Sequence, residues 1–166
     1  MGIRFQFISK ECKERSKGKN GKCIQRILCL HKGAIMIAIP IEKGTHDSMS
    51  TKLFGNAPFF ALIDPHTKIP KIVSNEGCGN GIKTANFLVQ LGATSALYGY
   101  LGDGPFYVMV REGMRVYWLG KEPMPLEQAI TIALEGNLIQ VTPDNASAYL
   151  DPGTSSGECE CGCSHA

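Results

Sequence analysis

The sequence predicts one mixed α/β domain built on a sheet of five strands. Three observations predict it: short apolar runs rich in β-branched residues, amphipathic segments between the later runs, and glycine or proline at the ends of those segments. A chain of 166 residues is long enough for one domain and short for two. We therefore expect a single domain at residues 34–143, with a leader at 1–33 and a flexible tail at 144–166.

Three strands are expected before the first helix. Residues 34–41 form a nearly continuous apolar run, which is typical of a strand buried on both faces. Residues 59–64 and 69–74 are expected to pair as a hairpin across the turn Pro65-His66-Thr67-Lys68. Asp64 is expected to accept backbone hydrogen bonds in that turn. A hairpin beside parallel strands makes the sheet mixed.

Helices and strands alternate in the second half of the expected domain. The three amphipathic segments lie between Gly81 and Gly92, between Pro105 and Gly113, and between Pro125 and Gly136. Strands are expected at residues 94–100 and 114–118. This alternation requires parallel strands joined by right-handed crossovers. After Pro143 the apolar pattern fades into Gly, Ser, Pro and acidic residues, so we expect the domain to end there.

Charge is unevenly distributed along the chain. Residues 1–33 carry nine Lys or Arg and two Asp or Glu, whereas residues 34–166 carry eight and thirteen, giving net charges of +7 and −5. The expected domain is acidic and lacks the basic surface typical of nucleic-acid-binding proteins. No apolar run approaches the roughly 20 residues that span a bilayer. We expect a soluble protein that binds neither nucleic acid nor membrane.

The first 33 residues show no helical or alternating pattern, and we expect a disordered basic leader. Two explanations remain open: a genuine basic arm, or a mis-assigned start with translation beginning at Met36. The leader's Cys12, Cys23, Cys29 and His31 do not match a zinc-finger spacing.

The number and placement of cysteines indicate reduced thiols. Seven cysteines is an odd number, three of them are crowded near the C-terminus, and no secretory signal is recognisable. A cytoplasmic protein is the simplest interpretation. Its thiols are then available to bind metal.

Two glycine-rich turns precede the first two expected helices, at residues 77–81 and 99–104. Such turns line the carboxyl ends of strands in open α/β sheets, where ligands usually bind, so we expect both to face one pocket. Helix N-termini favour anions, whether phosphate or an anionic metal-sulfur cluster. Neither turn matches a dinucleotide or P-loop motif. The candidate cofactor-binding glycines are Gly77, Gly79, Gly81 and Gly102.

Cys78 and His46 are the candidate ligands within the domain. A thiol just ahead of a helix N-terminus is favoured as thiolate, the form that binds metal, although Cys78 also suits a small buried residue beside glycines. His46 follows the first strand and is expected near the same end of the sheet. It is a candidate imidazole ligand or a solvated loop residue. His66 is expected at the far end.

The C-terminal tail carries a more specific signal. Cys159, Cys161 and Cys163 alternate along the chain and are followed by His165. Three thiolates and an imidazole suit Cu(I), Zn²⁺ or iron-sulfur species better than Mg²⁺ or Ca²⁺. The spacing is too tight for a zinc knuckle, and a tail with incidental cysteines is the alternative. We expect the tail to bind a soft metal, either alone or by delivering it to the residue 77–81 turn.

Catalytic arrangements are poorly supported. The sequence contains neither a nucleophile elbow nor an HExxH helix, and the first strand lacks the carboxylates that a two-metal nuclease requires. We expect a protein that is not an enzyme.

Several short segments occur in the order found in one family. They are Ile37-Ala38-Ile39-Pro40, Leu53-Phe54-Gly55-Asn56-Ala57-Pro58-Phe59-Phe60, Gly77-Cys78-Gly79-Asn80-Gly81, Leu91-Gly92-Ala93, Gly99-Tyr100-Leu101-Gly102, Glu112-Gly113-Met114-Arg115-Val116-Tyr117 and Leu126-Glu127-Gln128-Ala129-Ile130. Through this set the chain resembles the dinitrogenase iron-molybdenum cofactor biosynthesis family, which includes NifX-type proteins and the C-terminal domain of NifB.

The resemblance implies a ribonuclease-H-like three-layer fold with helices on both faces of the sheet and no nuclease activity. It implies binding of an iron-sulfur or iron-molybdenum-type cluster, or a precursor, and transfer to metallocluster-assembly or recipient proteins. The family often places His before the Phe-Gly pair, whereas this chain has Leu53 there. Cys78 is then the candidate to take over ligation.

Three hypotheses follow. The first is a non-catalytic carrier of a metal-sulfur cluster, the second a regulatory module that binds a phosphate-bearing small molecule, and the third a soft-metal chaperone acting through the tail cysteines. The sequence leaves open the identity of the metal, the recipient, the oligomeric state and any link to nitrogenase.

Overall fold

The computed structural model describes residues 35–151. Within them, six strands form one sheet: β1 (Ile37–Ile41), β2 (Phe59–Ile63), β3 (Pro70–Ser74), β4 (Ser95–Tyr98), β5 (Arg115–Trp118) and β6 (Ile139–Val141). The helices are α1 (Gly81–Gln90), α2 (Asp103–Arg111), α3 (Leu126–Glu135) and the short α4 (Ala146–Tyr149). None of these helices is long and apolar enough to cross a membrane. The basic leader lies outside the described residues.

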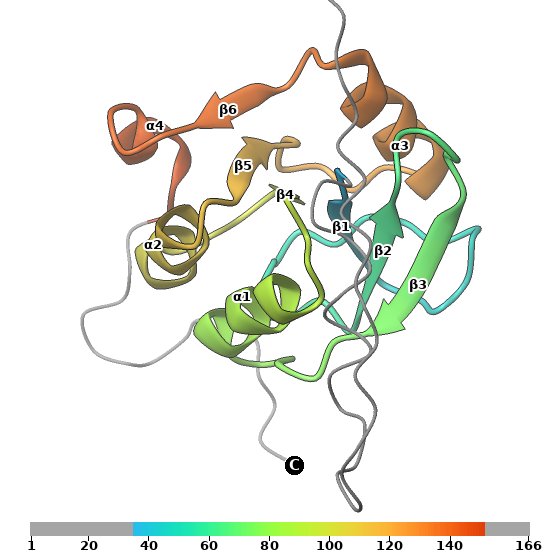
Figure 1. The fold of residues 1–166 in the computed structure, drawn as a ribbon, viewed down its shortest axis with the longest axis horizontal. Helices are drawn as coiled ribbons and strands as arrows, with labels where there is room; N and C mark the ends of the chain where they lie inside the picture. The colour runs from blue at the N-terminus through green and yellow to red at the C-terminus, as the bar shows by residue number, and fades with distance from the viewer. Residues whose placement is uncertain (1–34, 152–166) are drawn as a thin grey trace, which may run out of the picture. The chain divides into compact units, whose positions relative to one another are not determined.

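The sheet is mixed, as predicted, with strand order β3-β2-β1-β4-β5-β6 (Figure 1). β2 and β3 form the expected hairpin, in register from Phe59 opposite Ser74 to Ile63 opposite Pro70. In its turn, the His66 amide donates to the Asp64 carboxylate at 2.8 Å, which confirms the role predicted for Asp64. β1, β4 and β5 are parallel, whereas β6 is antiparallel to β5.

The prediction of five strands was wrong, because β6 adds a sixth. β6 has only three residues, and Ile139 and Gln140 are exposed, so it produces neither an apolar run nor a clear alternation. The packed chain also continues past Pro143, where we expected the domain to end. α4 follows β6, and its Ala146 is buried in the core.

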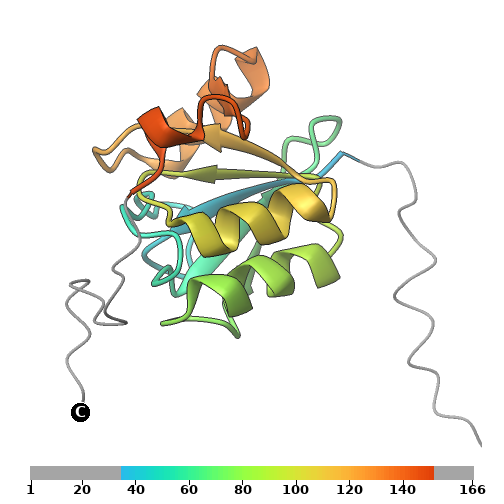
Figure 2. The ribbon, with the colours of Figure 1, turned by 90° about the vertical axis from the view of Figure 1, so that its left-hand side faces the viewer.

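The helices form layers on both faces of the sheet (Figure 2). α1 and α2 lie side by side on one face, where Leu88 and Phe106 pack with Ala38 of β1. α3 covers the other face, where Leu126 packs with Ile39 of β1. All five β1 residues are buried, which confirms the prediction of a strand covered on both faces.

The boundaries of α3 in the structure are those predicted from the sequence. Pro125 is the residue at its N-cap, and Gly136 ends the helix in the left-handed conformation, with φ of 74°. Leu126 and Ala129 are its buried residues, and Ile130 is among the partly buried residues that pack beside them. A narrow apolar stripe was therefore sufficient to predict this helix.

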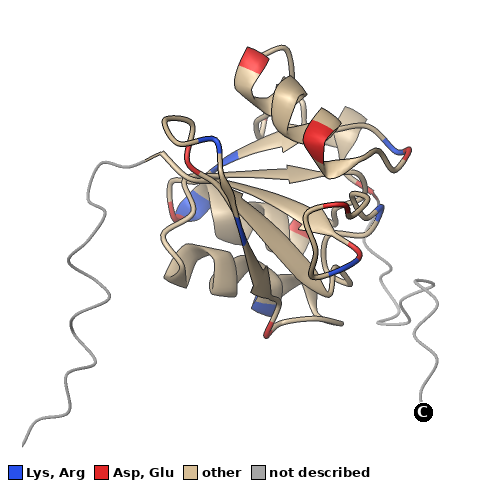
Figure 3. Cartoon of the chain, turned by 90° about the vertical axis from the view of Figure 1, so that its right-hand side faces the viewer, with Lys and Arg blue, Asp and Glu red and all other residues tan. Residues whose placement is uncertain are grey.

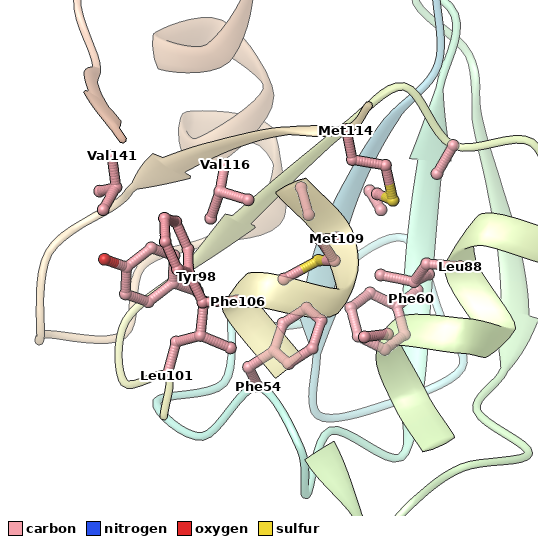
Figure 4. Close-up of a cluster of buried hydrophobic side chains, with 14 of the residues drawn as sticks. Phe54, Phe60, Leu88, Tyr98, Leu101, Phe106, Met109, Met114, Val116 and Val141 are labelled. Carbon is pink, nitrogen blue, oxygen red and sulfur yellow. The ribbon is translucent and has the colours of Figure 1, made fainter. Parts of the chain in front are cut away.

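The core between the sheet and the α1–α2 layer holds in place the loop that follows β1 (Figure 4). Phe54 of this loop is fully buried and makes an edge-to-face contact with Phe60 of β2, with ring centroids 5.6 Å apart. Buried aromatic pairs of this kind contribute about 1 kcal/mol beyond the area they bury. Phe54 therefore anchors an otherwise irregular loop to the rigid sheet.

Positions of Lys and Arg and positions of Asp and Glu are interspersed along the ribbon in Figure 3. Two surface ion pairs among the described residues are weak ones: Lys52 with Glu122 at 4.0 Å, and Arg111 with Glu112 at 3.4 Å. The described fold is therefore held together chiefly by its two apolar layers.

Candidate functional site

Three loops meet at the N-terminal ends of α1 and α2, and we refer to residues 52–57, 77–81 and 99–105 as the loop cluster. The first and third loops are joined because the Tyr100 amide donates to the Lys52 carbonyl at 2.7 Å, and the Phe54 amide to the Tyr100 carbonyl at 3.2 Å. The first and second are joined because the Gly79 amide donates to the Gly55 carbonyl at 2.9 Å. The two glycine-rich turns are thus connected through the first loop, and that both face one pocket stays a prediction.

A buried asparagine at the end of β3 positions the second loop. Asn75 is 6% exposed, and its side-chain amide donates to the Ala57 carbonyl at 2.7 Å and to the Thr84 hydroxyl at 3.1 Å. Its side-chain oxygen accepts from the Gly77 amide at 2.9 Å. One side chain therefore connects the first loop, the second loop and α1. Asn75 was not among the residues predicted from the sequence, where its only signal was its polar character directly ahead of the glycine-rich turn.

The candidate glycines differ in what surrounds them. A Cβ on Gly77 would lie 2.4 Å from the Thr84 backbone nitrogen, so this position is packed against α1. Gly79 has a φ of 89°, which side chains rarely adopt, and faces open space. A Cβ on Gly81 would lie 3.0 Å from the Pro105 ring, which brings the two helix starts together. Gly102, at the N-cap of α2, has no atom within 4 Å of its Cβ position.

Cys78 lies at the exposed side of the second loop. It is the one cysteine within residues 35–151, its thiol is free, and the side chain is exposed. Its Sγ donates to the Asn56 carbonyl at 3.5 Å, so the thiol faces the first loop. Asn80, two residues later, caps α1 by accepting from the Lys83 amide at 2.9 Å. The alternative of a buried space-filling cysteine does not describe this side chain.

The starts of α1 and α2 carry free backbone donors and lie against each other, with the Cβ position of Gly81 3.0 Å from the Pro105 ring. The amides of Gly81 and Ile82 in α1, and of Asp103 and Gly104 in α2, have no hydrogen-bond acceptor among residues 35–151. Such amides, together with the positive ends of the helix dipoles, favour a bound anion. α1 has no acidic residue in its first turn, whereas α2 has Asp103. The α1 end is therefore the more favourable of the two for negative charge.

Comparison with known proteins connects this geometry to a family. The family model described as dinitrogenase iron-molybdenum cofactor matches residues 36–136, which include the whole loop cluster. The chain belongs to this family. No curated protein matches the chain.

Solved structures share the family fold. The apo form of the orange protein from Desulfovibrio gigas is 27% identical, with a TM-score of 0.59, over 66% of this chain and 94% of that one. A putative NifB protein from Thermotoga is 26% identical, with a TM-score of 0.56, over 64% and 92% of the two chains.

Leu53 occupies the position before the Phe-Gly pair, where the resemblance led us to expect histidine. Leu53 pairs with Tyr100 in an isolated parallel bridge, and its side chain is 36% exposed. A histidine at this position would therefore lie at the edge of the loop cluster. In this chain the position is apolar, and Cys78 is the soft ligand that the described cluster offers.

The structure places His46 away from the helix N-termini. His46 is exposed and lines a hollow of about 670 Å³ together with Lys68 and residues of α3, on the sheet face opposite α1 and α2. Among residues 35–151, no three His, Cys, Asp or Glu side chains lie close enough to hold a metal ion. The predicted ligands Cys159, Cys161, Cys163 and His165 lie outside the described residues.

The end of the described chain is attached to the third loop. The Leu101 amide donates to the Asp151 carboxylate at 2.9 Å, and the Asp151 amide donates to the Leu101 carbonyl at 3.0 Å. Nearby, the buried Tyr98 hydroxyl donates to the Tyr149 carbonyl at 2.9 Å. Burial, and then the Asp151 carboxylate, raises the pKa of Tyr98. This attachment was not predicted from the sequence, because the domain was expected to end near Pro143, before α4.

Proposed function

We propose that this protein binds a metal-sulfur cluster, or a precursor of one, at the loop cluster and transfers it to another protein without catalysing a reaction. The observation that carries the proposal is an exposed thiol in the turn that leads into α1, whose first amides have no acceptor among the described residues, within the segment that matches a cofactor family. The strand order and directions support the ribonuclease-H-like class that the resemblance implies.

The chemistry of the loop cluster suits an anionic cargo containing sulfur. Backbone amides donate to the sulfur or oxygen atoms of such a cluster, and they add no charge that must be neutralised in its absence. The Cys78 thiolate supplies a soft ligand for iron, copper or molybdenum-type metals. The exposed Lys83, in the first turn of α1, adds a positive charge nearby. Open space beside Gly79 and Gly102 leaves room for the cargo.

A carrier protein must be able to release its cluster. A single protein ligand to the metal makes that release possible. A single protein thiolate together with backbone amides holds a cluster less firmly than a closed set of four cysteines, because fewer metal–protein bonds must break. Partners are then cluster-assembly or recipient proteins that offer more ligands. The cytoplasm is the compartment in which such a thiol stays reduced.

Anaerobic reconstitution tests this proposal. The full chain is loaded with iron, sulfide and molybdate, desalted, and examined by metal analysis and visible absorption. We expect bound metal with sulfide-to-metal charge-transfer bands, and a loss of most of both in Cys78→Ser. Cys23→Ser, which removes a leader thiol, is the matched control and should retain the signal. Absence of metal and visible bands in the unaltered chain would sink the proposal.

The contribution of positive charge at the α1 N-terminus to cluster retention is tested separately. Lys83→Glu places a negative charge at the α1 N-terminus, and we expect it to weaken cluster retention several-fold. Lys71→Glu makes the same change on β3 and should not. Equal retention by both variants would contradict the role of the α1 end.

The same amides also suit phosphate, which favours a phosphate-binding regulatory module as the second candidate. A thermal-shift screen with nucleotides separates the two functions. Stabilisation by a nucleotide that survives Cys78→Ala, in a chain that retains no cluster, would favour the regulatory module. Under the cluster-carrier proposal, nucleotides should leave the melting temperature unchanged.

A further inference from the structure

We propose that a groove along α3 docks an amphipathic helix of a partner protein, with basic side chains of that helix facing the acidic edge of α3. The groove is the hollow of about 670 Å³ that residues of α3 line together with His46, Lys68 and Pro70. We refer to it as the α3 groove. It lies on the sheet face opposite α1 and α2, so the inference does not rest on the function proposed for the loop cluster.

The groove extends along most of α3. It begins beside the start of the helix, where His46 lines it and the Leu126 amide donates to the Ser48 carbonyl at 2.9 Å. It continues to the last turn, where Leu134 and Glu135 line it. The helical rise from position 126 to position 135 makes this length about 14 Å. The groove is also open to solvent, so it has room for more than two turns of a second helix.

α3 provides the groove with an apolar floor and an acidic edge. Apolar residues recur at every fourth position and form the floor: Leu126, Ile130 and Leu134. Exposed polar residues recur with the same spacing and form the edge: Glu127, Thr131 and Glu135. Residues four apart lie on one face of a helix, so each set is a continuous stripe. An amphipathic helix offers the matching pattern, an apolar stripe bordered by polar side chains.

The sheet face beside the groove has apolar side chains that no second helix covers. α1 and α2 both lie on one face of the sheet, whereas α3 is the helix that packs on the other among the described residues (Figure 2). Ile72 of β3 belongs to the α3 side and is only partly buried. Ile69, between two residues that line the groove, is 71% exposed. Exposed apolar surface of this kind, bordered by polar residues, is typical of a protein-binding site.

The charge of α3 selects the chemistry of the partner. α3 contains two glutamates and no lysine or arginine, and its acidic positions are red in Figure 3. Neither Glu127 nor Glu135 has an ion-pair partner among residues 35–151. A second copy of this chain that docked through its own α3 would bring like charges together. A helix with Lys or Arg at two positions seven or eight residues apart would instead pair with both glutamates.

The opposite side of the groove carries positive charge. Lys68 and His46 are exposed, line the groove, and form no ion pair within the part of the chain that the structure describes. They do not favour a partner helix that is basic on both edges. The partner is therefore a helix whose basic edge faces α3 and whose other edge is uncharged or acidic. The apolar stripe supplies most of the affinity, and the charged edges fix the orientation.

Two designed peptides test the groove. Each is a stapled helix of about 12 residues with a leucine stripe, and the two differ only in carrying two Lys or two Glu, eight positions apart, on one edge. Binding to the full-length chain is measured by fluorescence anisotropy at physiological ionic strength. We expect the Lys peptide to bind about tenfold more tightly than the Glu peptide. If neither peptide binds, or both bind equally well, the proposal is wrong.

Charge reversal on the protein checks that α3 is the origin of this preference. The double variant Glu127→Lys, Glu135→Lys should prefer the Glu peptide. Glu76→Lys with Glu122→Lys makes the same change in net charge at exposed positions on other elements and should keep the preference for the Lys peptide. An equal loss of preference in both double variants would show that net charge alone attracts the peptide, which overturns the α3 groove as the site.

Filling the groove locates the binding site independently of charge. Thr131 is exposed and lines the groove, whereas Gln128 is exposed on α3 and does not line it. Thr131→Trp should therefore weaken binding of the Lys peptide about tenfold, and Gln128→Trp should leave it within twofold. Amide NMR spectra of both variants establish that the fold is retained. An unchanged affinity in a folded Thr131→Trp variant places the peptide elsewhere and contradicts the proposal.

Two other occupants of the groove give different results. Sedimentation of the full-length chain detects self-association, and a dimer that Thr131→Trp abolishes would make a second copy the occupant. A synthetic peptide of residues 1–34 tests the basic leader, and displacement of the Lys peptide by it at equal concentration would make the leader the occupant. We expect a monomer and no displacement. Either contrary result overturns docking of a partner helix.

Discussion

Replacing Gly77 with alanine tests whether the packing of the second loop against α1 determines the geometry of the site. The added Cβ would lie 2.4 Å from the Thr84 nitrogen, 2.5 Å from the Lys83 carbonyl carbon and 2.8 Å from the Thr84 Cα. Ordinary contact begins at 3.4 Å, and all three atoms belong to helix backbone. The loop must therefore move away from α1 by about 1 Å.

The cost of that movement has two parts. Overpacking of this kind costs about 1–3 kcal/mol. The shift also weakens two hydrogen bonds, from the Gly77 amide to Asn75 and from the Thr84 hydroxyl to the Gly77 carbonyl, at about 1 kcal/mol each. Alanine recovers about 0.5–1 kcal/mol by restricting the unfolded chain. The expected net loss of unfolding free energy is about 3 kcal/mol.

Urea denaturation followed by tryptophan fluorescence measures this loss, because Trp118 in β5 is the single tryptophan of the chain. We expect the unfolding temperature to fall by about 10 °C as well. Gly102→Ala is the matched control, since no atom lies within 4 Å of its Cβ position, and it should cost less than about 1 kcal/mol as a poorer N-cap. If Gly77→Ala is within 1 kcal/mol of the unaltered chain, the packing argument is refuted.

Three further predictions concern single side chains. Asn75→Ala leaves the buried Gly77 amide without its acceptor and should cost about 3 kcal/mol in urea denaturation, whereas the exposed Asn86→Ala control should stay within about 0.5 kcal/mol. Because folding raises the pKa of Tyr98, this side chain contributes to the free energy of unfolding. The contribution is fully present below about pH 10, the pKa of tyrosine in the unfolded chain, and is lost as the pH rises above it. Tyr98→Phe should therefore cost about 1 kcal/mol at pH 7, through the lost bond to Tyr149, and flatten the decline of unfolding free energy above pH 10; an equally steep decline would contradict this. Leu53→His places an imidazole at the edge of the loop cluster, and it should increase the metal retained after desalting relative to Leu53→Asn.

Local patterns predicted the elements that repeat a clear period. The α3 stripe and its glycine, the β1 apolar run and the β2–β3 hairpin each depend on residues close in sequence, and all were confirmed. β6 was missed because three residues, two of them exposed, carry too little pattern. α4 was missed because its four residues are held by contacts with the core and with Tyr98 rather than by periodicity.

The same division applies to the site. The sequence by itself determined that Cys78 lies in a glycine-rich turn ahead of a helix, and that soft ligands gather at residues 159–165, because these features are local. Only the tertiary structure decided that His46 lines the α3 side, that Asn75 fastens the second loop, and that Asp151 holds the end of the described chain beside Gly102. Each of these depends on hydrogen bonds or packing between residues far apart in the chain. Such contacts leave no periodic signal, because their partners are brought together only when the sheet and its two helical layers assemble.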